Sequence, residues 1–204
     1  GMERAQVKNV LKRQLYLLLR EETGKELPWG TLTGIRPTKL PMGMLKEGKR
    51  DVEIKACMRE TYFTSEEKTM LSIDIAKRER KILAGLHQTD GFSLYIGIPF
   101  CPTTCLYCSF TSYPIAKWKN RVEEYLAALK KEIDVTAGIY RDQILDTVYI
   151  GGGTPTTLTS EQLEELIIYV KERFDFKSVQ EFTVEAGRPD SITREKLDTL
   201  FRCG

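Results

Sequence analysis

Three successive strand, loop and helix patterns in the second half of the chain constrain its fold more than any other feature. Short apolar, β-prone segments at 93–98, 146–150 and 181–186 each run into a loop. After each loop, apolar residues recur at helical spacing, from Val122 to Ile133, from Leu163 to Val170 and from Leu197 to Phe201. Strands joined through helices in this way lie parallel, with right-handed crossovers. The sequence therefore predicts an α/β fold over 89–204, either a barrel or a doubly wound sheet.

Residues 1–88 are expected to form a mostly helical N-terminal region. Apolar residues recur at near-helical spacing over 4–20, and a second helical segment is expected around 44–60. Between them, the stretch 27–43 contains three prolines and three glycines, which is too many for a helix or a strand. We therefore expect an ordered loop there.

Threonine residues predict where three of the helices begin. Two of them have Glu or Gln three residues later, which is the spacing of a capping box, and the third precedes the last helical pattern: Thr64, Thr159 and Thr193. The first of these helices is expected to extend to about Leu86.

The charge balance and the lack of a long apolar run argue against nucleic-acid binding and membrane insertion. Lys and Arg number 31 against 29 Asp and Glu, for a net charge of +2, so no excess of positive charge favours nucleic acid or an anionic membrane as a partner. The longest apolar run near the start of the chain, Leu15 to Leu19, is far shorter than the roughly 18 residues of a membrane span. We expect a cytoplasmic protein whose cysteines bind metal or act in catalysis rather than form disulfides.

Three of the five cysteines lie directly after the first predicted strand: Cys101, Cys105 and Cys108. Soft thiolates suit iron, so this loop could bind three irons of an iron–sulfur cluster and leave the fourth open to a substrate. Alternatively, the three cysteines and His87, the only histidine, would make a structural zinc site. A redox pair of Cys105 and Cys108 is a third alternative. Cys57 and Cys203 show no such spacing and are expected to be small buried residues.

The loops after the second and third strands carry further candidate residues. In "GGGTP" (151–155), glycines allow the backbone to approach a ligand, although such a turn can also be purely structural. No Gly-Lys-Ser/Thr follows, so this is not a phosphate-binding loop. Glu185 ends the third strand, where it could contact a ligand, cap a helix or form a salt bridge. Parallel α/β folds build their sites at the carboxyl ends of strands, where all three loops stand.

The spacing Cys101-x-x-x-Cys105-x-x-Cys108 after a first strand, with Tyr107 before the last cysteine, resembles the signature of the radical S-adenosylmethionine (SAM) superfamily. The resemblance implies a [4Fe-4S] cluster on the three cysteines, with SAM chelating the open iron. It also implies that one electron from the cluster cleaves SAM to methionine and a 5′-deoxyadenosyl radical, which abstracts hydrogen from the substrate. The implied fold is an incomplete TIM-like barrel, of which this chain would supply the first three βα units.

The segments "LYIGIPFC", "YIGGGTPTTL" and "FTVEAGRPD" resemble the oxygen-independent coproporphyrinogen III oxidase group of this superfamily, and "PWGTLTGIRPTKL" resembles its HemZ-type members. The resemblance implies oxidative decarboxylation of two propionates of coproporphyrinogen III to the vinyl groups of protoporphyrinogen IX, in haem biosynthesis. An electron donor such as flavodoxin or ferredoxin would be a partner. No catalytic residue is implied beyond the ligands of the cluster and of SAM. The implied SAM contacts are Tyr95, Tyr107, Gly152, Gly153, Thr154 and Glu185.

Two positions depart from the decarboxylase pattern of that group. Gly97 stands where the pattern has histidine, and Phe110 stands where it has a further cysteine. The second departure resembles the haem-chaperone branch, so a haem-binding chaperone is an alternative function, beside a zinc-stabilised structural module. Arg36, Lys39 and Arg188 are candidate partners for propionate carboxylates, because guanidinium and ammonium groups match their charge. Ordinary salt bridges are the alternative for each.

A three-stranded parallel sheet leaves its edges unpaired and one face poorly covered. We therefore expect the chain to be the N-terminal part of a longer protein, divided into a helical region, 1–88, and a truncated barrel core, 89–204. On this interpretation the chain alone binds SAM poorly and is inactive.

Overall fold

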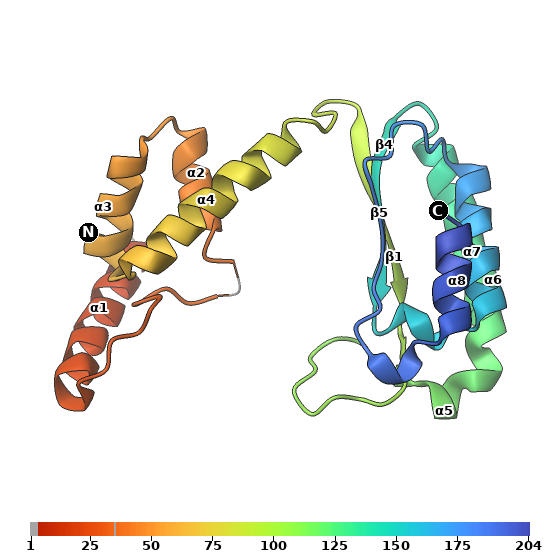
Figure 1. Ribbon diagram of the computed structural model, residues 1–204, viewed down its shortest axis with the longest axis horizontal. Helices are drawn as coiled ribbons and strands as arrows, with labels where there is room; N and C mark the ends of the chain where they lie inside the picture. Colours follow the sequence, from red (N-terminus) through yellow and green to blue (C-terminus); the bar gives the residue numbers. More distant parts are fainter. Residues whose placement is uncertain (1–3, 35) are drawn as a thin grey trace. The chain divides into compact units, whose positions relative to one another are not determined.

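A computed structural model describes residues 4–34 and 36–204 (Figure 1). The chain forms two compact units, Gly1–Gly85 and Leu86–Gly204, each with its own buried core. Within the described residues, none of the helices combines the length and the apolar character that crossing a membrane requires.

The first unit is helical. Its helices are α1 (Arg4–Thr23), α2 (Lys39–Lys46), α3 (Asp51–Tyr62) and α4 (Glu66–Leu83). The last three helices bury a small core, which consists of Met42, Leu45, Ile54, Met58, Ile73 and Ala76. α1 is attached through Tyr16, whose ring stacks on Phe63 with centroids 5.5 Å apart. The predicted helical character of this region is confirmed.

Two segments predicted in this unit differ from the structure. The stretch 27–43, predicted as a loop, contains the start of α2 at Lys39. Pro41 is compatible with this helix because it stands in the first turn, where backbone amides have no helical partner to lose. The helix predicted around 44–60 is two helices, because Gly48 adopts a left-handed φ of 79° and turns the chain between α2 and α3.

The cap of α4 lies one residue later than predicted. Ser65 precedes the helix, and its Oγ accepts a hydrogen bond from the Lys68 amide at 3.3 Å. Phe63 ends α3 in a left-handed conformation, with φ of 56°. The following residue, Thr64, is buried, and its Oγ1 has no hydrogen-bond partner among the described residues. Thr64 therefore packs inside the unit, and the next hydroxyl along the chain caps the helix.

The second unit contains a parallel sheet with helices on one face (Figure 1). Neighbouring strands in the sheet are β1 (Gly91–Ile98), β4 (Ile144–Gly152) and β5 (Glu181–Val184). Each strand is followed by a helix, namely α6 (Val122–Ile139), α7 (Ser160–Arg173) and α8 (Arg194–Arg202). Strand order in space equals strand order in the chain, as in the wall of a barrel. The predicted α/β fold, with three βα units of a partial barrel, is confirmed.

Short elements complete this unit. Between β1 and α6 lie β2 (Phe100–Cys101), β3 (Tyr113–Pro114), α5 (Ile115–Trp118) and the 3₁₀ turn η1 (Lys119–Arg121). Two further 3₁₀ turns follow β4 and β5, namely η2 (Pro155–Thr157) and η3 (Pro189–Ser191). Thr159 and Thr193 cap α7 and α8 as predicted, because each hydroxyl accepts a hydrogen bond from an amide of the first turn.

Side chains of the sheet alternate between its two faces. Toward the helices, β1 and β4 bury Ile96, Ile98, Val148 and Ile150. On the opposite face, the register places Tyr95 beside Tyr149 and Gly97 beside Gly151. This second face leads directly into the loops at the carboxyl ends of the strands, where the candidate site lies.

Candidate functional site at the carboxyl edge of the sheet

The cysteine loop, which carries Cys101, Cys105 and Cys108, begins in strand β2 and continues as an irregular segment. Cys101 lies in β2, which pairs with β3, and only 7% of its surface is exposed. Cys105 and Cys108 stand on the irregular segment between these strands, where the Cys108 amide donates to the Cys105 carbonyl at 3.0 Å. In the described parts of the chain, no three His, Cys, Asp or Glu residues are gathered closely enough to hold a metal ion. The fold thus fixes one cysteine and leaves two on the loop.

The glycine loop packs directly against the cysteine loop. The Gly153 amide donates to the Ile98 carbonyl at 2.7 Å, and the Thr154 amide donates to the Phe100 carbonyl at 2.8 Å. Gly152 adopts a φ of 112°, and a Cβ there would lie 2.8 Å from the Ile98 carbonyl oxygen. A Cβ on Gly153 would lie 2.7 Å from the Cys101 Sγ. The glycines are therefore required by this close approach of two loops, and the Gly153 and Thr154 amides are already hydrogen-bonded within the protein.

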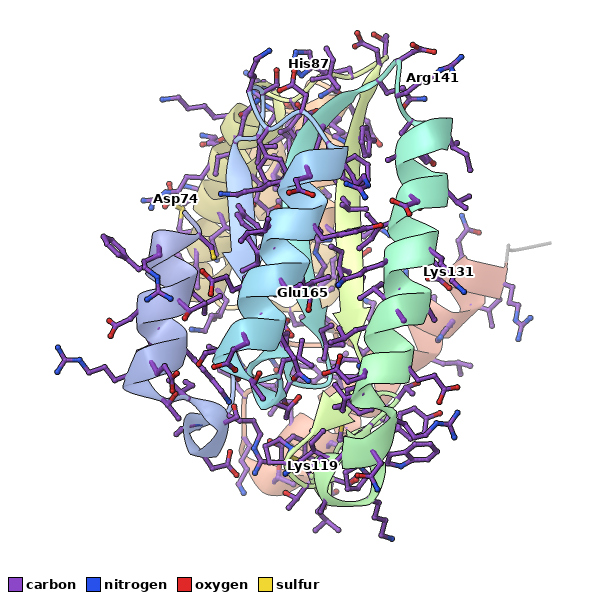
Figure 2. All side chains as sticks on the ribbon, turned by 90° about the vertical axis from the view of Figure 1, so that its right-hand side faces the viewer. Asp74, His87, Lys119, Lys131, Arg141 and Glu165 are labelled. Atoms are coloured by element: carbon purple, nitrogen blue, oxygen red, sulfur yellow. The ribbon has the colours of Figure 1, made fainter. Side chains whose placement is uncertain are left out.

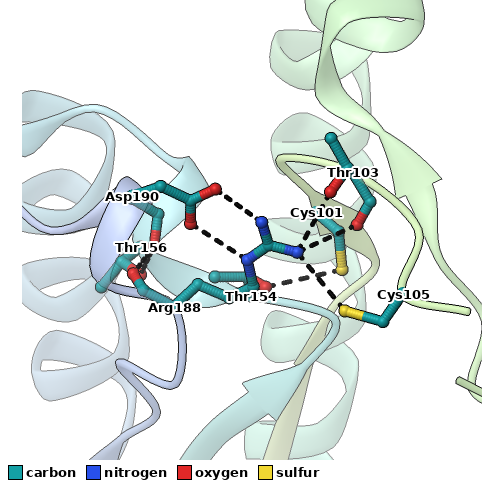
Figure 3. A network of polar contacts seen from close by, with 8 residues as sticks. Cys101, Thr103, Cys105, Thr154, Thr156, Arg188 and Asp190 are labelled. Atoms are coloured by element: carbon teal, nitrogen blue, oxygen red, sulfur yellow. Dashed lines mark hydrogen bonds and ion pairs between the residues drawn. The ribbon is translucent and has the colours of Figure 1, made fainter. Parts of the chain in front are cut away.

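Polar side chains donate to two of the cysteine sulfurs. Thr154 is buried, and its Oγ1 lies 3.5 Å from the Cys101 Sγ as a donor. Arg188, from the loop after β5, donates through Nη1 to the Cys105 Sγ at 3.4 Å and to Thr103 (Figure 3). Hydrogen bonds from a hydroxyl or a guanidinium stabilise negative charge on sulfur. The surroundings of Cys101 and Cys105 are therefore suited to thiolates.

The guanidinium of Arg188 is held from its other side by Asp190. Nε and Nη2 donate to the two carboxylate oxygens at 3.0 and 2.5 Å, which is a bidentate pair (Figure 3). These hydrogen bonds raise the pKa of Arg188 and lower the pKa of Asp190. Sequence analysis named Arg188 as a partner for substrate carboxylates or as part of a salt bridge. The structure gives it a salt bridge and, in addition, a contact with the cysteine loop that no local sequence pattern indicated.

Beside the two loops lies a pocket of about 360 Å³, a size within the range of small-molecule sites. Its lining includes Tyr95, Gly97, Phe110, Gly152, Gly153 and Glu185. The pocket thus brings together four of the six residues expected to contact SAM, with the two positions that depart from the decarboxylase pattern. Thr154 is buried against Cys101, and Tyr107 is 90% exposed on the loop.

Two residues that line the pocket, Tyr95 and Glu185, each contact Tyr149. The rings of Tyr95 and Tyr149 lie 5.9 Å apart between centroids, with an angle of 12° between their planes. The Tyr149 hydroxyl donates to Glu185 Oε1 at 2.6 Å, and this hydrogen bond raises the pKa of Tyr149. The Glu185 amide donates to the Ile150 carbonyl at 2.9 Å, which extends the sheet to this residue. Tyr149 was missed by sequence analysis, because alternation gives the face on which it lies but not the register that places it beside Tyr95.

His87 does not join the cysteines. Its Nδ1 lies 2.7 Å from Asp146 Oδ1, and its amide donates to Asp146 Oδ2 at 2.9 Å, at the amino ends of β1 and β4. In Figure 2, His87 and Arg141 stand at one end of this unit and Lys119 at the other. The cysteines follow the far end of β1, an eight-residue strand that spans roughly 25 Å at about 3.3 Å per residue. The alternative of a zinc site with His87 as the fourth ligand is therefore wrong.

The other two cysteines are not on the cysteine loop: Cys57 belongs to the helical unit, and Cys203 follows α8. Cys57 and Cys203 are only partly buried, so the expectation that both are buried is not met. Cys57 lies in the middle of α3, and Cys203 follows the end of α8.

Comparison with known proteins identifies the family that this part of the chain matches. The radical SAM superfamily matches residues 95–204. Over 199 residues, 41% are identical to the oxygen-independent coproporphyrinogen-III oxidase-like protein HemZ of Bacillus subtilis (strain 168), a match that covers 96% of this chain and 40% of HemZ. Over 113 residues, 42% are identical to the heme chaperone HemW of the same organism, which covers 55% of this chain and 29% of HemW.

A solved structure is also similar. It is the coproporphyrinogen III oxidase HemN from Escherichia coli, described as a radical SAM enzyme, with 27% identity and a TM-score of 0.49 over 61% of this chain and 29% of HemN. The chain thus spans less than half the length of each of these relatives. The superfamily match covers more than half of this chain and includes all three clustered cysteines, the glycine loop and Glu185. The chain therefore belongs to the radical SAM superfamily.

Proposed function

We propose that the chain holds a [4Fe-4S] cluster on Cys101, Cys105 and Cys108 and binds SAM in the adjoining pocket. The observation that carries the proposal is the meeting of three loops at one edge of the sheet: free cysteines, paired glycines and a carboxylate. Thiolates are the usual ligands of such clusters, and the donors to Cys101 and Cys105 fit thiolates. When bound, the two cofactors would supply one-electron cleavage of SAM and abstraction of hydrogen from a substrate.

The remaining residues of the site would bind and orient SAM. The Tyr95 ring, which stacks on Tyr149, offers an apolar surface in the pocket, and Glu185 offers acceptors for a cationic or hydroxyl group. Tyr149 holds one oxygen of that carboxylate, which fixes its orientation. Gly152 and Gly153 would act by bringing the glycine loop against the cysteine loop, so that the cluster and SAM share one pocket.

For the whole protein, we propose oxidative decarboxylation of coproporphyrinogen III in the cytoplasm, with reduction by a flavodoxin or ferredoxin. Each of two propionates would lose a hydrogen atom from its β-carbon to the 5′-deoxyadenosyl radical, then CO2 and one electron, which passes to an electron acceptor, and would become a vinyl group. The identity with HemZ over nearly the full chain supports this assignment.

A second candidate function is that of a haem chaperone. Two observations favour it: the 42% identity with HemW, and the presence of Phe110 in the pocket. A pocket that binds haem without transforming it would need no redox chemistry at the porphyrin side chains.

Anaerobic reconstitution with iron and sulfide tests the cluster. We expect about four iron atoms per chain and the broad visible absorbance of an iron–sulfur protein. Cys105→Ala should lose most of the iron, and Cys203→Ala, a partly buried cysteine outside the site, should retain it. Binding of one zinc per chain with no retained iron would refute the proposal.

The reaction is tested in a chimera in which this chain replaces the matching part of Bacillus subtilis HemZ. The chimera is incubated anaerobically with SAM, a reductant and coproporphyrinogen III. Release of two CO2 per substrate supports decarboxylation. Tight haem binding without CO2 release would instead support the chaperone function.

A further inference from the structure

The helical unit contains a larger cavity that is separate from the site on the sheet. Its volume is about 570 Å³, and every residue that lines it belongs to the unit Gly1–Gly85. The walls come from α1, from the segment that precedes α2, from α2 itself and from the turn after α2. A cavity of this size is large enough for a small-molecule ligand.

The charged residues around this cavity are mostly basic. Among the described residues four cations line it, one from each of the four parts that form the walls: Lys12, Arg36, Lys39 and Lys49. Of the described residues that line the cavity, one is a carboxylate, that of Glu47. The cavity therefore has an excess of positive charge, although the whole chain is nearly neutral at +2.

Protein partners neutralise only part of that charge. Lys49 pairs with Glu47 at 3.1 Å, and Arg36 reaches Glu79 at 3.8 Å with 72% of its own side chain exposed. Among the residues that the structure describes, no carboxylate lies within ion-pair distance of the Lys39 ammonium. Among the described residues Lys12 also has no carboxylate partner, but its ammonium already donates to the Thr33 hydroxyl at 2.6 Å. Lys39, and Arg36 with its exposed side chain, are the cations best placed to receive carboxylates from a ligand.

The floor of the cavity is apolar. It includes Leu32, Leu40, Met44 and Tyr62, all of which pack on the buried core of the helical unit. A ligand that suits both surfaces has an apolar body and at least two anionic groups. An inorganic anion would leave the floor uncovered, and a neutral hydrocarbon would leave the cations unmatched.

We propose that this cavity binds an amphipathic polycarboxylate, with its carboxylates on Arg36 and Lys39 and its apolar body on Leu40 and Met44. The choice of a tetrapyrrole as that polycarboxylate rests on the proposed function. The site itself rests on the cavity and its charges. A ligand bound in this cavity would give the helical unit a role in holding substrate or product, and that role would not depend on the cysteine loop.

Fluorescence titration of the 204-residue chain with coproporphyrin III, the stable oxidised tetracarboxylate, tests this site. Lys39→Gln and Arg36→Gln should each weaken binding by about tenfold, since a lost charged hydrogen bond changes affinity by this order. Lys39→Arg should retain binding because it keeps the charge. Lys46→Gln, on the same helix but outside the cavity lining, is the matched control and should have no effect.

Equal affinity in the wild type, Lys39→Gln and Arg36→Gln, or equal weakening in Lys46→Gln, would overturn the proposal. Circular dichroism of each variant excludes loss of fold as the cause of weaker binding. Cys105→Ala keeps this test apart from that of the cluster: it should lose iron and still bind coproporphyrin III. Lys39→Gln should bind iron normally.

Discussion

At the scale of single residues, Gly97 and Gly153 differ in the room that each leaves for a side chain. A Cβ on Gly153 would lie 2.7 Å from the Cys101 Sγ, whereas a Cβ on Gly97 would meet only the Tyr95 ring at 3.5 Å. Gly153→Ala should therefore lower the free energy of unfolding by about 1–3 kcal/mol, as other overpacking substitutions do. Gly97→Ala should change it by less than about 0.5 kcal/mol.

Urea unfolding of both variants measures these free energies. Equal stability of the two variants would contradict the packing role assigned to Gly153. The same geometry predicts that Gly97→His folds, since the first side-chain atom enters the pocket without a clash.

Arg188 is predicted to position the cysteine loop. Arg188→Gln removes the donors to Cys105 and Thr103, so the affinity for iron should fall by about tenfold, a loss typical of contacts that orient metal ligands. Iron retained by the reconstituted chain in a chelator titration measures the affinity. Arg194→Gln, whose side chain is 96% exposed, is the control. An unchanged chelator midpoint in Arg188→Gln would show that the loop is held without it.

Residues of the site differ in how well the sequence predicts them. Cys101, Tyr95 and Glu185 follow from short motifs beside strands, and the structure places the last two in one pocket. Tyr149 and the role of Arg188 depend on contacts across 36 and 83 residues of the chain. Local spacing cannot report such contacts, because they arise only when the strands align.

At the scale of elements, His87 joins the segment before β1 to the start of β4. Its hydrogen bond with Asp146 raises the pKa of His87 above its ordinary value of 6.5 and lowers that of Asp146 below 3.8. The stability that the folded state gains from protonated His87 is fully present below about pH 6.5 and is lost as pH rises through the raised pKa of His87. The stability that the folded state gains from ionised Asp146 is fully present above about pH 4 and is lost as pH falls through the lowered pKa of Asp146. The pair therefore stabilises the sheet most between these values.

His87→Gln tests this pH dependence. The difference in the free energy of unfolding between wild type and variant should be largest near pH 5 and should shrink toward pH 8. The measurement is urea unfolding at a series of pH values. A difference that stays constant from pH 5 to pH 8 would mean that the charged pair contributes nothing.

Elements were predicted well where their signals are local. The strands and the caps at Thr159 and Thr193 follow from alternation and from hydroxyls at fixed spacing. The division between α2 and α3 was missed because it depends on the left-handed turn at Gly48. The cap of α4 was misplaced because burial of Thr64 is a property of the packed unit.

At the scale of the whole molecule, the two units have separate cores. Met58 and Leu163 are both fully buried, the first among helices α2 to α4 and the second between the sheet and its helices. Met58→Ala and Leu163→Ala should each destabilise their own unit by about 2–5 kcal/mol. Hydrogen exchange assigned to individual amides measures each unit separately. Equal loss of protection in both units from either substitution would mean that they unfold as one.

The three clustered cysteines differ in exposure, and this difference predicts the order in which air oxidises them. Cys101 is sealed by β2, Gly153 and Thr154, whereas Cys105 and Cys108 stand on an irregular and more exposed segment. Oxidation to sulfenic acid or to a disulfide follows accessibility and thiolate character. Of these three thiols, a stored sample without metal would lose the two on the loop first and keep Cys101 reduced. Loss of the cluster ligands would then be set by the exposure of this segment rather than by the stability of the fold.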